Sequence, residues 1–158
     1  MASLEIPIEA KQAPLKDILG ESFRYDIPKY QRPFSWDKEQ FQKLVEDVAD
    51  SLSDSNGEGV YFLGAIVIFN KESNLQEIID GQQRLVALTV LLACIRDLIK
   101  DQKNRASLKE RIYQEEDELT EKKKTERVHP WKKLEGHFNE YIYKDGGSRS
   151  FLKDFKPS

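Results

Sequence analysis

The residues best suited to chemistry lie together at positions 80–84, where a predicted strand ends and a long predicted helix begins. The free N–H groups of a first helical turn, together with the helix dipole, attract anions. The guanidinium of Arg84 can hold a phosphate through two parallel hydrogen bonds. The amides of Gln82 and Gln83 can bind a phosphate oxygen or orient a water, and Asp80 can hold a metal ion or a proton. The alternative is structural: Asp80 only caps the helix and the glutamines are solvated.

A second group of candidate residues lies at positions 28–36, directly after the first predicted strand. Pro28 and Pro33 exclude a regular helix there and favour an extended, rigid loop. Such a loop can stack a base on an aromatic ring and bind phosphate through a cation. We assign this function to three residues: Tyr30, Gln31 and Arg32. Phe34 and Trp36 are instead predicted to anchor the loop on the core.

Composition excludes several classes of protein. The chain has 158 residues and a net charge of -3, so it is not a polycation that coats nucleic acid. One cysteine and two histidines exclude a disulfide framework, a thiolate zinc site and a His-rich metal site. The sequence indicates no metal ligands beyond Asp80. No targeting signal or apolar run of membrane-spanning length is present, so we expect no membrane contact and a cytoplasmic location.

Hydrophobic patterning predicts the elements that position both groups. Helices are predicted at 14–20, 37–52 and 82–100, and strands at 23–27, 60–69 and 75–79. The strand at 60–69 is apolar enough to be buried, and Gly64 within it indicates a bulge or a close backbone approach.

The chain changes character after residue 100, where charged residues become frequent. We predict a helix at 107–119 and another that ends near residue 143, followed by a break at 146–148 and ten loosely held residues. The predicted organisation is therefore an α+β domain at 1–100 and a charged helical extension at 101–158.

Three motifs carry a resemblance to a known family. They are Pro28-x-Tyr30-Gln31-Arg32-x-x-x-Trp36, Phe62-Leu63-Gly64 and Asp80-Gly81-Gln82-Gln83-Arg84-Leu85. In this order they resemble the N-terminal domain of the GmrSD group of modification-dependent restriction enzymes. That domain is similar to the ParB/sulfiredoxin fold and is known by its DGQQR motif. The resemblance covers the first hundred residues.

The resemblance implies a small mixed sheet packed by helices, and a nucleotide site. Family members bind and hydrolyse nucleoside triphosphates and couple this to recognition or cutting of modified foreign DNA. Residue by residue, the resemblance gives catalytic roles to Asp80, Gln82, Gln83 and Arg84. It gives nucleotide-binding roles to Gly81, Arg84, Tyr30, Gln31, Arg32 and Gly64. We expect Mg²⁺ to accompany the triphosphate, because phosphoryl transfer depends on positioning and charge neutralisation.

Two departures from related families limit the activity expected of this chain. Sulfiredoxins carry a catalytic cysteine in the equivalent turn, whereas Cys94 lies among apolar residues of the predicted helix, which makes a poor nucleophile. Full-length relatives also carry a His-Asn-His type nuclease, and His129 and His137 lack its other residues. We therefore expect that nuclease to be a missing C-terminal or separate partner.

Two alternatives to triphosphate hydrolysis are kept open. The first is a non-catalytic sensor, in which the turn at 80–84 and the Tyr30 loop bind modified DNA. The second is direct DNA cleavage of the ParB-like nuclease type. We favour it least, because the sequence shows no cluster of carboxylates for metal-assisted hydrolysis.

Overall fold

A small mixed sheet forms the framework of the computed structural model, which describes residues 9–53, 61–72, 74–114, 116, 118–119 and 124–155. The strand order is β2-β3-β1-β6. The bounds are Arg24–Asp26 for β1, Val67–Glu72 for β2, Leu75–Asp80 for β3 and Val128–His129 for β6. Strand β1 is parallel to β3 and β6, whereas β2 is antiparallel to β3. The predicted α+β class with a small mixed sheet is confirmed.

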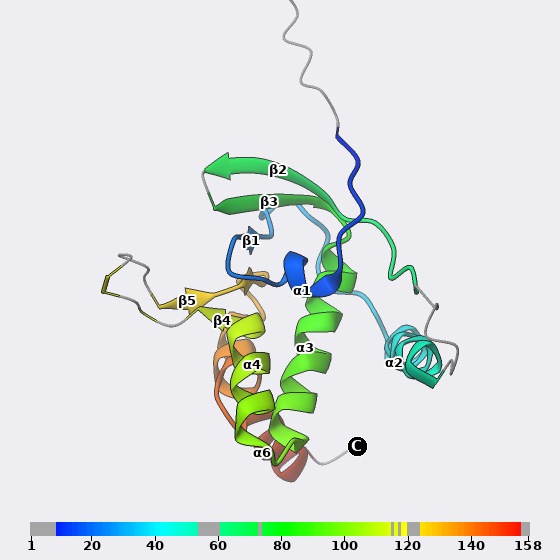
Figure 1. Ribbon diagram of the computed structural model, residues 1–158, viewed down its shortest axis with the longest axis vertical. Helices are drawn as coiled ribbons and strands as arrows, with labels where there is room; N and C mark the ends of the chain where they lie inside the picture. The colour runs from blue at the N-terminus through cyan, green and yellow to red at the C-terminus, as the bar shows by residue number, and fades with distance from the viewer. Residues whose placement is uncertain are drawn as a thin grey trace, which may run out of the picture.

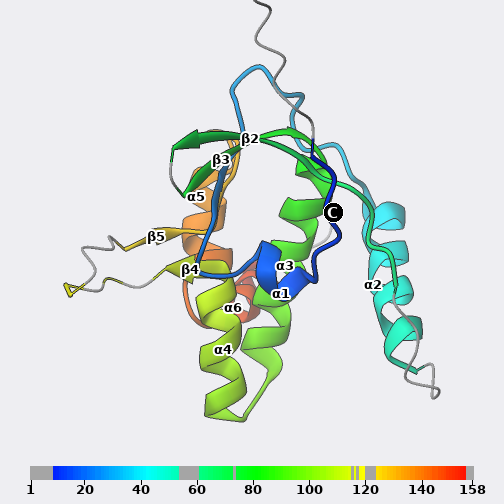
Figure 2. The ribbon, with the colours of Figure 1, turned by 45° about the horizontal axis from the view of Figure 1, so that its top comes forward.

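In Figure 1 the labelled helices lie below β2 and β3, and β2 stays exposed along its length. The helix bounds are Leu15–Ile18 for α1, Lys38–Ser53 for α2, Gln82–Leu98 for α3, Gln102–Ile112 for α4, Glu135–His137 for α5 and Gly147–Asp154 for α6. A π-helix, η1, spans Phe138–Tyr143, and a two-stranded sheet pairs β4 (Tyr113–Gln114) with β5 (Thr125–Glu126). Helices α3 and α4 lie side by side, and α2 stands on the opposite side of α3 in both views (Figures 1 and 2).

The main core lies between the sheet and α3. Tyr25, Ile78 and Val128 come from three adjacent strands and are fully buried against Leu85 and its neighbours on α3. The Tyr25 hydroxyl donates a hydrogen bond of 2.7 Å to the Ile18 carbonyl, and burial raises the pKa of Tyr25 to about 12. This packing fixes the start of α3 relative to the end of β3.

Helix α2 belongs to a smaller core cluster. Its Leu44 is buried together with Ala87 and Leu88 of α3, and Trp36 and Leu63 pack against this group. The Tyr61 hydroxyl also donates a hydrogen bond of 2.7 Å to Asp47 of α2. The predicted amphipathic helix is confirmed to within a residue at each end.

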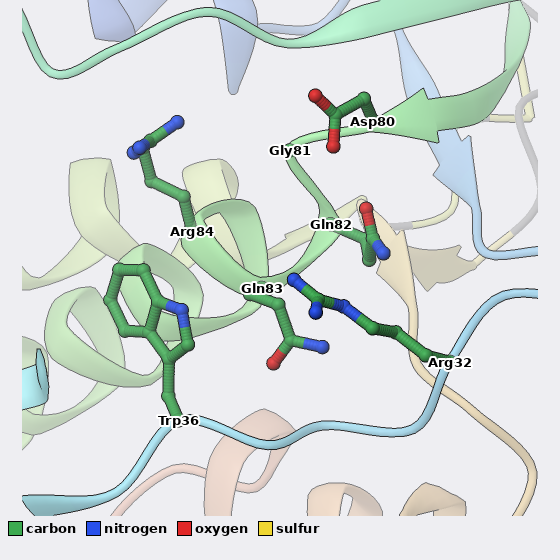
Figure 3. Close-up of a pocket in the computed structure, with 7 residues that line it drawn as sticks. All are labelled: Arg32, Trp36, Asp80, Gly81, Gln82, Gln83 and Arg84. Carbon is green, nitrogen blue, oxygen red and sulfur yellow. The ribbon is translucent and has the colours of Figure 1, made fainter.

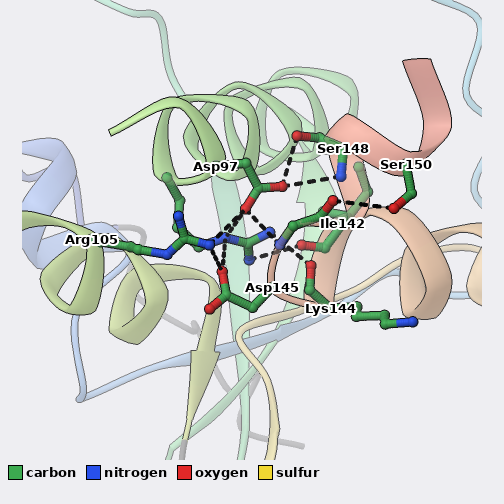
Figure 4. Close-up of polar contacts among 9 residues, drawn as sticks. Asp97, Arg105, Ile142, Lys144, Asp145, Ser148 and Ser150 are labelled. Carbon is green, nitrogen blue, oxygen red and sulfur yellow. Dashed lines mark hydrogen bonds and ion pairs between the residues drawn. The ribbon is translucent and has the colours of Figure 1, made fainter. Parts of the chain in front are cut away.

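A buried ion pair within α3 forms hydrogen bonds to the segment from η1 to α6 (Figure 4). The side chains of Arg96 and Asp97 are fully buried, and Arg96 Nε lies 2.8 Å from Asp97 Oδ1. Arg96 also donates to two backbone carbonyls, those of Ile142 (3.0 Å) and Lys144 (2.9 Å). Because every charged group has partners, the pair is tolerated in the core.

Asp97 also holds the first turn of α6. It accepts hydrogen bonds from the Gly146 amide (3.0 Å), the Ser148 amide (3.0 Å) and the Ser148 hydroxyl (2.7 Å). Burial alone would raise the pKa of Asp97, but the bonds from Arg96, Ser148 and Gly146 outweigh it and lower the pKa to about 2. The prediction that residues 149–158 are loosely held is wrong for 149–154, because these residues belong to α6; residues 156–158 lie outside the described part.

Two further sequence predictions are wrong. The buried strand at 60–69 is replaced by an irregular segment at 61–66 and by β2, whose residues are all exposed because β2 is an edge strand. Residue 60 lies outside the described part. The helix at 107–119 is replaced by α4, whose N-cap Asp101 accepts a hydrogen bond from the Asn104 amide. Pairing of β4 with β5 ends α4 at Ile112, and residues 115 and 117 lie outside the described part.

The division at residue 100 stays a prediction. Strand β6 lies beyond that residue and pairs with β1 in the main sheet. Arg127, also beyond it, donates to the Glu21 carbonyl at 3.3 Å. The later segment therefore contacts the earlier one directly.

Candidate functional site

The two predicted groups meet at one edge of the sheet. Strands β1, β3 and β6 are parallel, so their carboxyl ends lie at the same edge. The loop at 28–36 follows β1, and the turn at 80–84 joins β3 to α3. In sheets with parallel strands, ligands bind outside the carboxyl ends.

A pocket of about 160 Å³ lies between the loop and the turn. Seven residues line it: Arg32, Trp36, Asp80, Gly81, Gln82, Gln83 and Arg84. Figure 3 shows the Arg32 guanidinium extending from the loop toward the two glutamines, with the ring of Trp36 on the side where Arg84 lies. The whole Asp-Gly-Gln-Gln-Arg motif therefore borders one cavity.

Gly81 is required by the backbone of the turn. Its φ is +90°, a conformation that favours glycine, and a Cβ there would lie 2.7 Å from Ile66 Cγ2 and 2.9 Å from the Ala65 carbonyl oxygen. Gly81 is also the N-cap of α3 and supplies no side-chain hydrogen bond. The N–H groups of the first turn therefore keep their capacity to bind an anion.

Arg84 is held against the segment 61–66. Its Nη1 donates to the Ala65 carbonyl at 3.2 Å. Gly64 has a φ of +105°, and a Cβ there would lie 2.5 Å from Arg84 Nη1 and 2.9 Å from Arg84 Nε. The close approach predicted for Gly64 is thus between its backbone and the guanidinium of Arg84. The remaining N–H groups of Arg84 can still reach a ligand.

Gln82 has one polar atom without a partner. The residue is 4% exposed, and its Nε2 donates to Gln31 Oε1 at 3.2 Å. Its Oε1 is buried and accepts no hydrogen bond from any residue that the structure describes. A buried unpaired acceptor is costly, so a water or a ligand N–H or O–H group would be favourable beside it.

Gln83 uses both polar atoms to hold the loop. It is 5% exposed, its Nε2 donates to the Pro33 carbonyl at 2.9 Å, and its Oε1 accepts from the Ser35 amide at 2.8 Å. Sequence analysis missed this role, because the two partners lie about fifty residues away and are backbone atoms. No local pattern could have revealed it.

The pocket also contains two charged groups open to solvent. Arg32 and Asp80 are exposed, and neither side chain has a hydrogen bond or ion pair with another described residue. Arg32 therefore supplies a cation to the pocket, and Asp80 supplies one carboxylate.

Three predicted site residues lie outside the pocket lining. Tyr30 is 71% exposed, and its hydroxyl donates to Glu77 Oε1 at 2.8 Å, which raises the pKa of Tyr30. Gln31 donates to the Ile79 carbonyl at 2.9 Å and so fixes the loop to β3. Gly64 acts on the pocket through Arg84.

Phe34 and Trp36, predicted to anchor the loop on the core, both pack against core residues, but only Trp36 also lines the pocket. Phe34 packs against the main core and meets Trp131 edge to face, with ring centroids 6.1 Å apart, as expected of an anchor. Trp36 packs against the cluster of Leu44 and also lines the pocket. Its place in the pocket wall was missed, because an aromatic residue next to a helix start is equally typical of core packing.

The residues set aside on sequence grounds lie away from this pocket. Burial raises the pKa of the Cys94 thiol, which disfavours the thiolate. His129 lies 3.5 Å from the carboxylate of Glu126, and the ring of His137 contacts that of Tyr141.

The comparison with protein families agrees with this geometry. The model of the family described as the N-terminal domain of the GmrSD restriction endonuclease matches residues 15–154. The chain belongs to this family. The match includes both sides of the pocket and continues through α6. As a GmrSD N-terminal domain, the protein is part of a restriction system. A search among curated proteins found no match. None of the described helices is long and apolar enough to span a membrane.

Proposed function

We propose that this GmrSD N-terminal domain binds the phosphates of a nucleoside triphosphate in the pocket and hydrolyses it. The observation that carries the proposal is the convergence of Arg32, Arg84 and the uncapped first turn of α3 on one cavity. Two cations and a set of backbone N–H groups are the donors that phosphate prefers. The unpaired, buried Oε1 of Gln82 in the same lining independently favours a ligand or water there.

The size of the pocket indicates which part of the nucleotide enters it. Pockets that enclose a whole drug-sized ligand have about 300–1,000 Å³, whereas this one has about 160 Å³. We therefore assign the pocket to the phosphates. The base and sugar would lie outside it.

Four of the lining residues have a chemical role in this proposal. Arg32 and Arg84 hold the charge that develops on the transferred phosphoryl group, and Gln82 Oε1 accepts a hydrogen bond from the attacking water. A bound Mg²⁺ would neutralise phosphate charge. Asp80 suits it as a single carboxylate ligand, because Mg²⁺ is commonly bound by one or two carboxylates plus substrate phosphates.

Thermal unfolding with added triphosphate and Mg²⁺ tests the proposal. A ligand that binds only the folded state raises Tm by mass action. Arg32→Ala is the most informative variant, because Arg32 has no partner among the described residues and its loss should leave the unliganded protein intact. Arg32→Ala and Arg84→Ala should abolish the shift, whereas Arg149→Ala, an exposed arginine on α6, should preserve it. An equal shift in all four proteins would contradict the proposal.

We further propose that the activity serves anti-phage restriction of modified DNA in the bacterial cytoplasm, together with a His-Asn-His type nuclease. One observation favours the sensor alternative: Tyr30 and Phe62 are 71% and 75% exposed, and exposed rings can stack bases. DNA binding without phosphate release from any triphosphate would favour the sensor over the hydrolase.

A further inference from the structure

Gln83 bonds α3 to the backbone in the middle of the loop, whereas Gln82 bonds α3 to the side chain of Gln31 nearer the start of the loop. The two hydrogen bonds of Gln83 reach the Pro33 carbonyl (2.9 Å) and the Ser35 amide (2.8 Å). These backbone groups adjoin, along the chain, the two loop residues that line the pocket, Arg32 and Trp36. The amide of Gln83 is therefore bonded at the point where the loop forms the pocket wall.

We infer that Gln83 is a positioning residue, which holds Arg32 over the first turn of α3 so that a triphosphate meets two cations. This inference rests on the proposed function for its ligand. The inference gives the two adjacent glutamines different roles. Gln82 has an unpaired Oε1 that can bind a water or ligand, whereas both polar atoms of Gln83 are already hydrogen-bonded to the loop.

Other contacts hold different parts of the loop. Gln31 fixes its first half to the Ile79 carbonyl, and the ring of Phe34 packs against Trp131. The prolines restrict the backbone of the loop, but they do not set its distance from α3. Among the described contacts, only the hydrogen bonds of Gln83 join the backbone of Pro33 and Ser35 to the turn at 80–84.

The expected effect follows from the number of bonds lost. Two hydrogen bonds of ordinary strength shift a local equilibrium by roughly 5- to 150-fold. Apparent affinity falls in proportion to the population of the binding-competent state. Loss of the Gln83 amide should therefore raise the triphosphate Kd and KM by at least several-fold and by at most roughly 150-fold, with a smaller effect on kcat.

Two variants separate the bonds. Gln83→Leu removes both, and Gln83→Glu keeps an acceptor for the Ser35 amide but places an oxygen against the Pro33 carbonyl. The matched control is Gln76→Leu, since Gln76 is also a buried glutamine (4% exposed) but lies on β3, where it bonds Asn70. Hydrogen exchange of the Ser35 amide, measured by NMR without ligand, shows whether Gln83 still holds the loop. Triphosphate affinity and kinetics then show what the loss of these hydrogen bonds does to the pocket.

We expect Gln83→Leu to accelerate exchange of the Ser35 amide and to weaken triphosphate affinity. Gln83→Glu should weaken affinity with a smaller effect on exchange. Gln76→Leu should change neither quantity. In an Arg32→Ala background, Gln83→Leu should weaken affinity little further. Unchanged Ser35 exchange in Gln83→Leu would overturn the inference, as would faster exchange with unchanged affinity. If the unmodified protein binds no triphosphate, the proposed function fails, while Ser35 exchange still decides whether Gln83 holds the loop.

Discussion

Gly64→Ala is the substitution whose effect on the site can be worked out most fully. The added methyl would lie 2.5 Å from Arg84 Nη1 and 2.9 Å from Arg84 Nε, closer than such atoms can approach. The guanidinium lies at the end of a flexible side chain, so it would move rather than the backbone. Arg84 would then lose its hydrogen bond to the Ala65 carbonyl and its position beside the pocket.

The magnitude has two parts. The φ of +105° is strained for alanine, which costs about 1–3 kcal/mol of unfolding free energy. The lost bond from the partly exposed Arg84 adds about 1 kcal/mol. Triphosphate affinity should fall separately, by roughly 10- to 150-fold, if one charge-assisted hydrogen bond of about 1.5–3 kcal/mol to phosphate is lost.

Urea unfolding and equilibrium triphosphate binding measure the two parts. Gly146→Ala is the matched control: Gly146 also has a positive φ, +77°, but a Cβ there meets no atom within 4 Å. Gly146→Ala should lower the free energy of unfolding through backbone strain but leave triphosphate affinity unchanged. In the double variant Gly64→Ala/Arg84→Ala, affinity should equal that of Arg84→Ala, because the methyl then has no guanidinium to displace.

Two results would refute this reasoning. Normal triphosphate affinity in Gly64→Ala would mean that the position of Arg84 against Gly64 is irrelevant to binding. Additive losses in the double variant would mean that Gly64 acts on the pocket by a route other than Arg84.

Three further predictions concern other parts of the molecule. Gln82→Ala should lower phosphate release by roughly 10- to 1,000-fold with triphosphate binding nearly intact; an equal loss of both would assign Gln82 to binding alone. Tyr30→Ala should weaken DNA binding by roughly 5- to 150-fold in electrophoretic or fluorescence titrations, with little change in Tm because the ring is 71% exposed; unchanged DNA binding would remove Tyr30 from the interface. The pKa of Asp97 is lowered from 3.8 to about 2 in the folded state, so its stabilisation is complete above the unfolded pKa and is lost as pH falls through the folded value. Urea unfolding should therefore show a loss of about 2 kcal/mol between pH 5 and pH 2 that is missing in Asp97→Asn, and identical slopes in both proteins would contradict it.

Elements with strong local signals were predictable. The apolar spacing along α3 and the glycine before it located its start at Gln82, and the spacing along α2 located that helix to within a residue at each end. Local patterns failed where neighbours in space decided the outcome. The apolar run before Asn70 became an irregular segment at 61–66 followed by the exposed edge strand β2, because β3 is the one strand that pairs with β2 among the described residues.

The candidate site divides in the same way. Residue types alone indicated an anion-binding turn at 80–84 and a cationic loop at 28–36, because a glycine at a strand-to-helix junction and a forked guanidinium have these properties in any fold. Which residue does what required the tertiary structure. Tyr30 is bonded to Glu77 outside the pocket, whereas Trp36 lines it.

The sequence by itself therefore determined the family, the α+β class and the chemical character of the site. These depend on side-chain type, on short-range spacing and on short motifs, each of which spans only a few residues. The tertiary structure alone decided that Arg32 lies in the same pocket as Arg84, that Gln83 holds the loop and that Gln82 keeps an unpaired oxygen. The reason is physical: these relations depend on residues about fifty positions apart in the sequence, and the packing of the chain sets their geometry.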